Sequence, residues 1–186
     1  MKARLVTPLF ASVIVFAPAL AAQSEPCSGV GNFHQLNQTV YRGAQPSPEG
    51  FRSLAKIGIK TIIDLREAGG RAAAERKVVE AAGMRYVNIP MNGHAAPTGQ
   101  QISRLLSLLN DRSAGPVFVH CRRGADRTGT IMACYRIAHD HWENQKALNE
   151  AKTNGMSWTE FAMKHYVLGY KSADQTVASA VAGSDQ

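Results

Sequence analysis

Between residues 39 and 170, the chain alternates short apolar runs with longer stretches in which apolar residues recur at helical spacing. The short runs are typical of buried strands, and the longer stretches of helices that bury one face. Strands are predicted at 39–42, 60–64, 85–89 and 117–119, and helices at 47–57, 72–82, 98–110, from 127 onward, at 144–154 and at 157–170. This alternation predicts an α/β fold, with a mostly parallel central sheet and helices on both faces.

Local signals mark the ends of these helices. Ser47 precedes a proline at the first helical position and is expected to cap its helix. Thr98 with Gln101, and Ser157 with Glu160, have the spacing of capping boxes. Glycines at 83 and 155 follow two of the predicted helices and indicate where those helices end.

The two ends of the chain differ from this pattern. Residues 1–22 combine Lys2 and Arg4 with an apolar stretch and the small residues Ala19 and Ala21, which predicts a cleavable signal peptide. An uncleaved membrane anchor is the alternative. Residues 23–37 are predicted to be a flexible start of the mature chain, 38–171 the folded domain, and 172–186 a disordered tail. We therefore expect a periplasmic or secreted protein with no stable membrane span after processing.

Composition adds few constraints. The chain has 186 residues, of which 45% are hydrophobic, enough for one domain with a core. Without Lys2 and Arg4, 19 basic and 14 acidic side chains give a net charge of +5, which suits a phosphorylated substrate. No basic stripe interleaved with aromatic residues is present, so nucleic acid is not an expected partner. A monomer is expected.

Candidate chemistry lies in the run His120-Cys121-Arg122-Arg123-Gly124-Ala125-Asp126-Arg127-Thr128. It follows a predicted strand and opens a predicted helix, so the backbone N–H groups of residues 122–127 are left for an anion. Such a position stabilises a Cys121 thiolate, which is a nucleophile. The Arg127 fork can bind two phosphate oxygens. Thr128 is expected to hydrogen-bond the sulfur, and His120 to orient the loop.

This run resembles the signature loop of the cysteine-based phosphatases, His-Cys-x5-Arg-Thr, and the chain is similar to dual-specificity members from residue 38 to about 170. Further similar segments are 41–46, 58–66 and 89–90. The resemblance implies hydrolysis of phosphomonoesters through a phosphocysteine intermediate, with no metal or other cofactor. It implies phosphate binding by Arg122, Arg123, Gly124, Ala125, Asp126 and Arg127.

The general acid departs from the family pattern. Most relatives carry an aspartate in a mobile loop before the helix at 98–110, whereas residues 91–100 here contain no carboxylate. The candidates, in order, are Asp126 in the signature loop, Asp64 at a strand end, and His94, the titratable side chain of the mobile loop. Each has a structural interpretation as well: a carboxylate that holds Arg127 or a loop amide, a strand-end salt bridge, and a solvated histidine.

The substrate class stays open between several possibilities. Phosphotyrosine, with phosphoserine or phosphothreonine, is the first expectation. Arg122, Arg123, Lys60 and Arg66 could bind extra phosphates, which would favour a phosphoinositide or inositol polyphosphate, although solvent-facing arginines are the more usual outcome. The same signature run is also compatible with an inactive phosphopeptide-binding module or with a rhodanese-like sulfurtransferase.

Two further cysteines accompany Cys121. Cys134 lies in the helix after the loop and is expected in the core, while Cys27 lies near the start of the mature chain. In an oxidising compartment, a Cys27–Cys121 disulfide would switch such an enzyme off.

Overall fold

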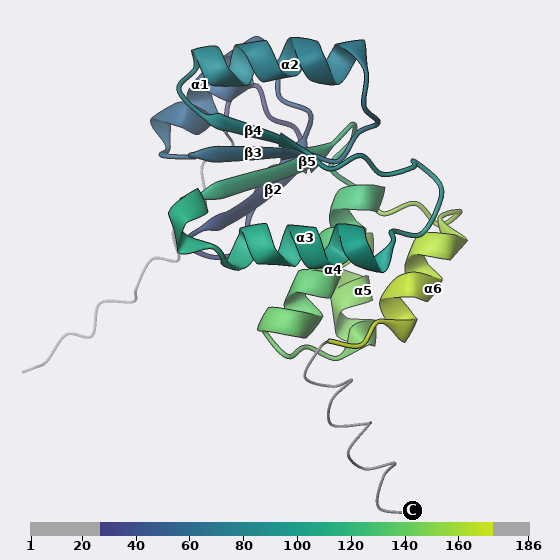
Figure 1. The fold of residues 1–186 in the computed structure, drawn as a ribbon. Coiled ribbons are helices and arrows are strands. Elements are labelled where there is room, and N and C mark those ends of the chain that lie inside the picture. The colour runs from purple at the N-terminus through teal and green to yellow at the C-terminus, as the bar shows by residue number, and fades with distance from the viewer. Residues whose placement is uncertain (1–26, 173–186) are drawn as a thin grey trace, which may run out of the picture.

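A five-stranded sheet forms the centre of the protein (Figure 1). This computed structural model describes residues 27–172. The strands are β1 (His34–Gln35), β2 (Val40–Ala44), β3 (Thr61–Asp64), β4 (Arg85–Asn88) and β5 (Val117–Cys121), in the order β1-β2-β5-β3-β4. All neighbouring pairs are parallel except β1 with β2. The mostly parallel sheet predicted from the alternating pattern is therefore confirmed.

Helices cover both faces of the sheet (Figure 1). One face carries α1 (Pro48–Lys56) and α2 (Gly70–Ala81); the other carries α3 (Gly99–Asn110), α4 (Asp126–His139), α5 (Asn144–Thr153) and α6 (Phe161–Gly169). A 3-10 turn at Arg112–Ala114 leads into β5. Along β5, Phe118 joins the core on the α1 and α2 side, while Val117, Val119 and Cys121 join the core on the other side. Strand β5 thus links both cores and ends at the signature loop.

Two of the three predicted caps form as expected. The Ser47 hydroxyl accepts a hydrogen bond from the Gly50 N–H at 3.1 Å, and Pro48 opens α1. Thr98 and Gln101 make the reciprocal bonds of a capping box at the start of α3. Each such cap contributes about 1 kcal/mol to helix stability.

The third predicted cap is wrong. Helix α6 begins at Phe161 instead of Ser157, and Glu160 precedes it without a side-chain capping bond. The Ser157 N–H donates instead to Asp126 Oδ1 at 2.8 Å. A contact from the signature loop has replaced the local one, so the segment between α5 and α6 is drawn toward that loop.

Residues 27–37 are also more ordered than predicted. Cys27 and Val30 are buried in the core under α1, and His34–Gln35 adds the antiparallel edge strand. Backbone bonds from Ser47 N to the Gly29 carbonyl and from Ala44 N to the Gly31 carbonyl hold the segment along β2. The folded unit therefore begins before residue 38, and at its other end Ser172 is still buried.

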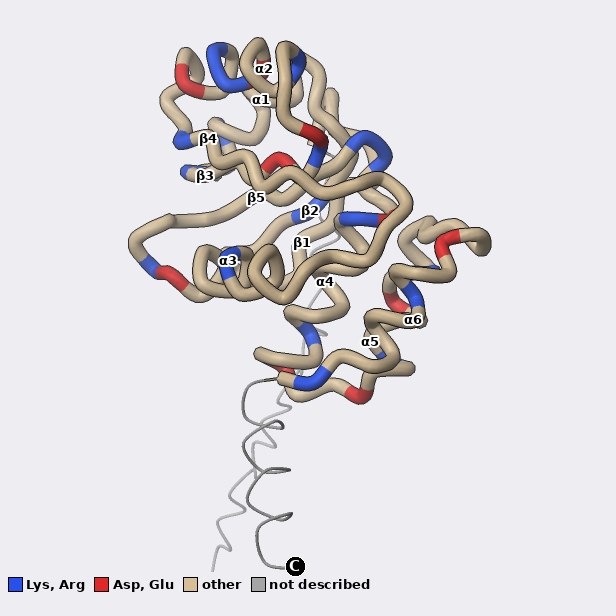
Figure 2. Tube along the Cα trace, turned by 45° about the vertical axis from the view of Figure 1, so that its right-hand side comes forward, with Lys and Arg blue, Asp and Glu red and all other residues tan. Residues whose placement is uncertain are grey.

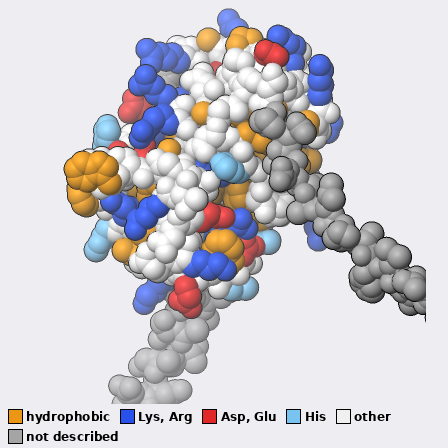
Figure 3. All heavy atoms as spheres, turned by 180° about the vertical axis from the view of Figure 1, so that it is seen from behind, with side chains coloured by type: hydrophobic (Ala, Val, Ile, Leu, Met, Phe, Trp, Pro, Cys, Tyr) orange, Lys and Arg blue, Asp and Glu red, His pale blue; other side chains and the backbone are white. Residues whose placement is uncertain are grey.

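The predicted signal peptide and most of the predicted tail lie outside the described residues. Among residues 27–172, no helix has the length and apolar character needed to cross a membrane. The most exposed large apolar side chains of that part are Trp158 and Phe161, at 79% and 68%. From behind, Figure 3 shows a protruding hydrophobic group beside Lys and Arg side chains.

Candidate active site

The signature loop turns the chain from β5 into α4. Cys121 is the last residue of β5 and is only 3% exposed, and α4 begins at Asp126. Gly124 adopts φ +67°, and a Cβ added there would lie 2.3 Å from the carbonyl carbon of Gly43. Glycine is required at this position both by its backbone conformation and by the close approach of β2. The loop is thereby pressed against the sheet, with its amides at the start of a 14-residue helix.

Two side chains from the first part of the chain support the loop from below. Arg42 on β2 is 1% exposed, and its guanidinium donates to the Gly124 carbonyl. Asn32 Nδ2 donates to the same carbonyl at 3.1 Å and to the Asn154 carbonyl at 3.0 Å. Burial lowers the pKa of Arg42 to about 10, while the charges of Glu150 and Cys121 oppose this shift. Arg42 therefore keeps its positive charge at neutral pH beneath the loop.

Thr128 and His120 are both buried beside the signature loop. The Thr128 hydroxyl has no hydrogen-bond partner among the described residues, so the expected bond to the Cys121 sulfur is not formed in this structure. His120 is also fully buried, and its Nδ1 lies 3.3 Å from the Cys121 carbonyl oxygen. On its other side, His120 Nε2 lies 2.8 Å from Glu75 Oε1.

A buried ionic cluster lies beside His120. Asp64 accepts hydrogen bonds from the Arg66 backbone N–H, from the Arg66 guanidinium and from the Tyr86 hydroxyl. Arg66 also contacts Glu75 Oε2 at 2.5 Å. Burial alone would raise the pKa of Asp64, but the bonds from Arg66, the charge of His120 and the Tyr86 bond lower it overall. The cluster fixes Arg66, which lies at the mouth of the site.

Asp64, Glu75 and His120 place potential ligand atoms within 4.8 Å of one another. Arg66 and Tyr86 already occupy the Asp64 carboxylate, and a guanidinium inside the cluster disfavours a cation there. The donor set fits an ion-pair network better than a metal site.

An arginine-lined cavity of about 610 Å³ opens over the signature loop. Arg122 and Arg127 line it from the loop, and Arg66 and Arg71 from the segment between β3 and α2. Gly93 and His94 line it from the loop between β4 and α3. The exposed Glu67, from the segment between β3 and α2, also lines it. Figure 2 shows basic segments converging at this end of the sheet. Four arginines around one cavity suit an anionic substrate. Arg123, expected among the phosphate-binding residues, does not line it.

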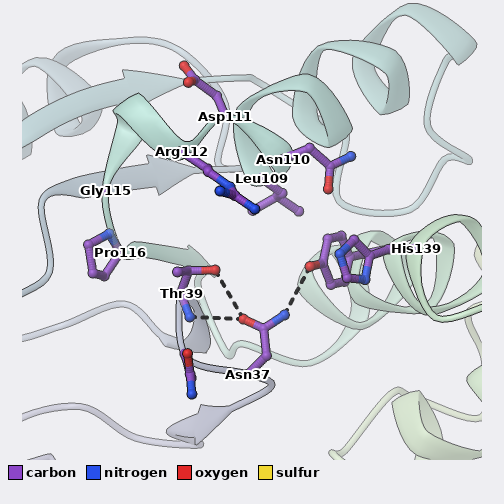
Figure 4. A pocket seen from close by; sticks show the side chains of 11 residues that line it. Asn37, Thr39, Leu109, Asn110, Asp111, Arg112, Gly115, Pro116 and His139 are labelled. Carbon is purple, nitrogen blue, oxygen red and sulfur yellow. Dashed lines mark hydrogen bonds between the residues drawn. The ribbon is translucent and has the colours of Figure 1, made fainter.

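A larger cavity of about 740 Å³ lies at the opposite edge of the sheet, around Asn37, Thr39 and His139 (Figure 4). Asn37 bridges this region, since its side chain donates to the Tyr135 hydroxyl and accepts from the Thr39 backbone N–H. In parallel α/β sheets, ligands bind at the carboxyl ends of strands. This cavity lies at the amino ends of β2 and β5, so we assign the site to the smaller one.

The three candidate acids are placed very differently. Asp126 uses Oδ1 to accept from the Ser157 N–H and Oδ2 to contact Arg123 at 2.5 Å, which is a structural role. Asp64 is fully buried and bonded on both oxygens. His94, ranked last from the sequence, lines the cavity beside Arg127. Both carboxylates are thus occupied by other protein groups, whereas His94 is the candidate that lines the cavity.

The three cysteines are free thiols in the structure. Cys27 packs in the core under α1, whereas Cys121 belongs to the core on the other face of the sheet. This placement does not favour a Cys27–Cys121 disulfide. Cys134 is fully buried in α4, as expected.

Sequence reasoning missed several residues that build this site. Arg42, Asn32, Glu75 and Tyr86 support the loop or the ionic cluster, and Arg71 lines the cavity. Only Arg42 and Arg71 carried a signal, since a cation at a predicted strand end or directly before a predicted helix start is a candidate anion ligand.

Comparison with known proteins agrees with this geometry. Residues 18–168 match the family model described as DSP-PTPase phosphatase fused to NAD+ kinase. The dual specificity protein phosphatase TpbA of Pseudomonas aeruginosa strain UCBPP-PA14 is 30% identical over 75% of this chain and 60% of its own length. The inositol diphosphatase DSP3 of Arabidopsis thaliana is 27% identical over 69% of this chain and 65% of its length. The chain thus spans less than two thirds of these curated relatives.

Solved structures show the same fold. P. aeruginosa TpbA in complex with pTyr superposes with a TM-score of 0.63 at 26% identity, covering 80% of this chain and 90% of that chain. The catalytic core of the PP-IP phosphatase SIW14 from S. cerevisiae superposes with a TM-score of 0.67 at 20% identity, covering 83% and 93%. With the signature loop, the cavity above it and a family match over most of its length, the chain belongs to the DSP-PTPase phosphatases, within the superfamily of cysteine-based protein tyrosine phosphatases.

Proposed function

We propose that this protein hydrolyses phosphate monoesters, with phosphotyrosine as the first substrate class, through a phosphocysteine intermediate. The observation that carries the proposal is the placement of Cys121 at the end of β5, in the loop that leads into α4 and that lines a cavity with Arg122 and Arg127. A relative of the same family is named a dual specificity protein phosphatase, and its structure holds pTyr.

The chemistry has two steps. The Cys121 thiolate attacks phosphorus, an S–P bond forms, and the P–O bond to the leaving group breaks. Water then attacks the phosphocysteine, the S–P bond breaks, and inorganic phosphate leaves. In both steps, negative charge on the phosphoryl oxygens is stabilised by the loop amides and by Arg127.

Phosphate release under reducing conditions tests this proposal. We expect the unmodified protein to release phosphate from a phosphotyrosine peptide and from p-nitrophenyl phosphate. Cys121→Ser should release none. Arg127→Lys should be slower by about 10²-fold or more, because lysine lacks the planar fork. An acid-trapped phosphoenzyme should carry its phosphate on Cys121. Tight peptide binding with no phosphate release by the unmodified protein would instead establish an inactive binding module. Sulfur transfer from thiosulfate would establish a rhodanese-like sulfurtransferase.

An inositol polyphosphate is the second candidate substrate. Arg71 adds a cation to those of the signature loop around the cavity, which gives a second phosphate a partner, whereas Arg66 is already paired with Asp64 and Glu75. Inositol diphosphatases and a PP-IP phosphatase are among the similar proteins. Arg71→Ala should then lower turnover of an inositol polyphosphate much more than turnover of p-nitrophenyl phosphate. Equal effects on both substrates would favour the phosphotyrosine assignment.

We also propose that the chain is exported and that residues 1–22 are removed. The basic start, the apolar stretch and the small residues before position 22 support this proposal. Expression in a bacterial host, with separation of periplasm from cytoplasm and mass measurement of the product, tests it. A full-length protein that stays in the membrane fraction would contradict it.

A further inference from the structure

His94, which lines the cavity of the proposed active site, contacts Glu160. His94 Nδ1 lies 3.1 Å from Glu160 Oε1. The His94 side chain is 90% exposed, whereas the Glu160 side chain is 8% exposed. The two residues come from separate segments, the loop between β4 and α3 and the residue before α6. A buried carboxylate thus contacts a largely exposed imidazole that lines the cavity.

The loop that carries His94 is fixed at several points. Asn92 Oδ1 accepts hydrogen bonds from the backbone N–H groups of His94 and Ala95, at 2.8 and 3.2 Å. Met91 is buried, and its carbonyl accepts from the Arg127 guanidinium at 3.3 Å. The backbone of His94 is therefore held in a defined turn, three residues after a direct contact with the phosphate-binding arginine.

Glu160 is also tied to the signature loop. Three residues before it, the Ser157 N–H donates to Asp126 Oδ1, and the Glu160 N–H donates to the Ser157 carbonyl at 3.3 Å. Asp126 lies next to Arg127 in the signature loop. The carboxylate and the imidazole are thus both positioned by contacts that originate at the signature loop.

We propose that His94 is the general acid of this phosphatase and that Glu160 is its positioning residue. This inference rests on the proposed phosphatase function. The loop that holds His94 contains no carboxylate, and both Asp64 and Asp126 are bonded on their two oxygens. His94 is the titratable side chain that this loop contributes to the cavity.

Proton transfer balances over the two steps. In the first, Nε2–H of the His94 imidazolium gives its proton to the leaving oxygen as the P–O bond breaks. In the second, neutral Nε2 takes a proton from the attacking water as the S–P bond breaks, so the imidazolium and the Cys121 thiolate are both restored. Nδ1–H stays directed at Glu160, which keeps Nε2 as the exchanging nitrogen and stabilises the imidazolium.

Leaving groups of different basicity test the proposal. A nitrophenolate departs with little help from an acid, whereas the tyrosine phenolate needs a proton. We expect His94→Ala to lower kcat for a phosphotyrosine peptide about 10²-fold or more, and kcat for p-nitrophenyl phosphate only a few-fold. His94→Asp should restore much of the phosphotyrosine rate. His165→Ala removes a different exposed histidine, which lies on α6, and should leave both rates unchanged.

Glu160→Gln should show the same selective loss in a smaller degree. The double variant His94→Ala/Glu160→Gln should be no slower than His94→Ala, because Glu160 acts through the imidazole. Side-chain nitrogen NMR should show His94 protonated on Nδ1, with this preference lost in Glu160→Gln and His165 unchanged. This spectrum keeps the assignment of Glu160 testable if the kinetic effect of the substitution is small.

The pH profile supplies a separate readout. Besides Glu160, the charged residues that line the cavity with His94 are Arg66, Arg71, Arg122, Arg127 and Glu67. Because an unperturbed carboxylic acid loses its proton at lower pH than an imidazolium, His94→Asp should move the alkaline fall of phosphotyrosine turnover to lower pH.

Three outcomes would overturn the inference. One is equal loss of both substrates in His94→Ala; another is selective loss of phosphotyrosine turnover in Glu67→Gln with none in His94→Ala. An additive loss in the double variant would overturn the role of Glu160. Failure of the unmodified protein to hydrolyse even p-nitrophenyl phosphate would instead show that the proposed phosphatase function is wrong.

Discussion

The three thiols of this chain have the same chemistry, and their surroundings alone make their reactivity different. Burial raises the pKa of Cys134 in α4 and that of Cys27 under α1. Cys121 instead lies at a helix start, above the buried guanidinium of Arg42 and near Arg127. A thiolate is stabilised only in the last of these settings.

We therefore predict selective alkylation. Iodoacetate at mildly acidic pH should modify Cys121 and leave Cys27 and Cys134 intact, and inorganic phosphate should slow the reaction by occupying the cavity. Peptide mass mapping measures the adducts. Equal labelling of Cys134 under native conditions would contradict this account of the loop.

The Asp126 carboxylate has a structural role, because it holds the Ser157 N–H and the Arg123 guanidinium. Removing it in Asp126→Ala leaves the N–H of Ser157 without its acceptor, which costs about 1–3 kcal/mol of unfolding free energy. Because Asp126 ties Ser157 to the signature loop, turnover of p-nitrophenyl phosphate and of phosphotyrosine should fall together. Urea unfolding and both assays measure these effects. A loss confined to phosphotyrosine would restore Asp126 as the acid.

The turn between β5 and α4 depends on one glycine. Gly124→Ala combines a positive φ with a Cβ placed 2.3 Å from the Gly43 backbone, so the loop must move. The conformation alone costs about 1–2 kcal/mol, and displaced amides no longer face the phosphate. We predict a folded protein with phosphatase activity reduced by at least about 10²-fold. Gly99→Ala at the start of α3, where a Cβ meets nothing within 4 Å, is the matched control and should keep both stability and activity.

The helices and longer strands could be predicted because their signals lie within a few residues. The elements that were missed depend on contacts between residues far apart in the sequence. Ser47 and Thr98 cap their helices with bonds to residues three positions away, which a sequence displays directly. Strand β1 has two residues, and its pairing with β2 leaves no periodic pattern. Helix α6 starts later than predicted because the Ser157 N–H bonds to Asp126, 31 positions earlier. Local spacing cannot report such a contact.

The residues of the active site likewise fall into a local group that the sequence reveals and a distant group that only the fold reveals. Its nucleophile and phosphate loop lie in nine consecutive residues, so their spacing predicted them. The surrounding charged and polar groups come from β2, α2 and β4, which only the fold brings together, as Arg42, Glu75 and Tyr86 show. This is why the rank of the three acid candidates could not be set from the sequence.

The buried cluster around Asp64 should govern acid stability. In the folded protein, the pKa of this carboxyl is lowered overall against the effect of burial, chiefly by Arg66. Since an unfolded aspartate titrates near ~3.9, this stabilisation is present above that pH and is lost as the pH falls through the lower folded value. Asp64→Asn should lower the unfolding free energy at neutral pH by about 3–5 kcal/mol and flatten its dependence below about pH 4.

Denaturant titrations at a series of pH values measure both effects. The exposed Asp111, replaced by Asn, is a control that leaves this cluster intact. An unchanged pH dependence in Asp64→Asn would show that other carboxylates govern acid unfolding.

The bond from Arg127 to the Met91 carbonyl ties the phosphate-binding arginine to the turn that bears His94. This bond uses Nη1, so Nη2 and Nε of the same guanidinium can still form a fork to a phosphoryl group. One side chain can thus bind the substrate and hold the acid-bearing turn at the same time. Amide hydrogen exchange at residues 92–95 should therefore stay slow when vanadate fills the cradle and quicken in Arg127→Ala.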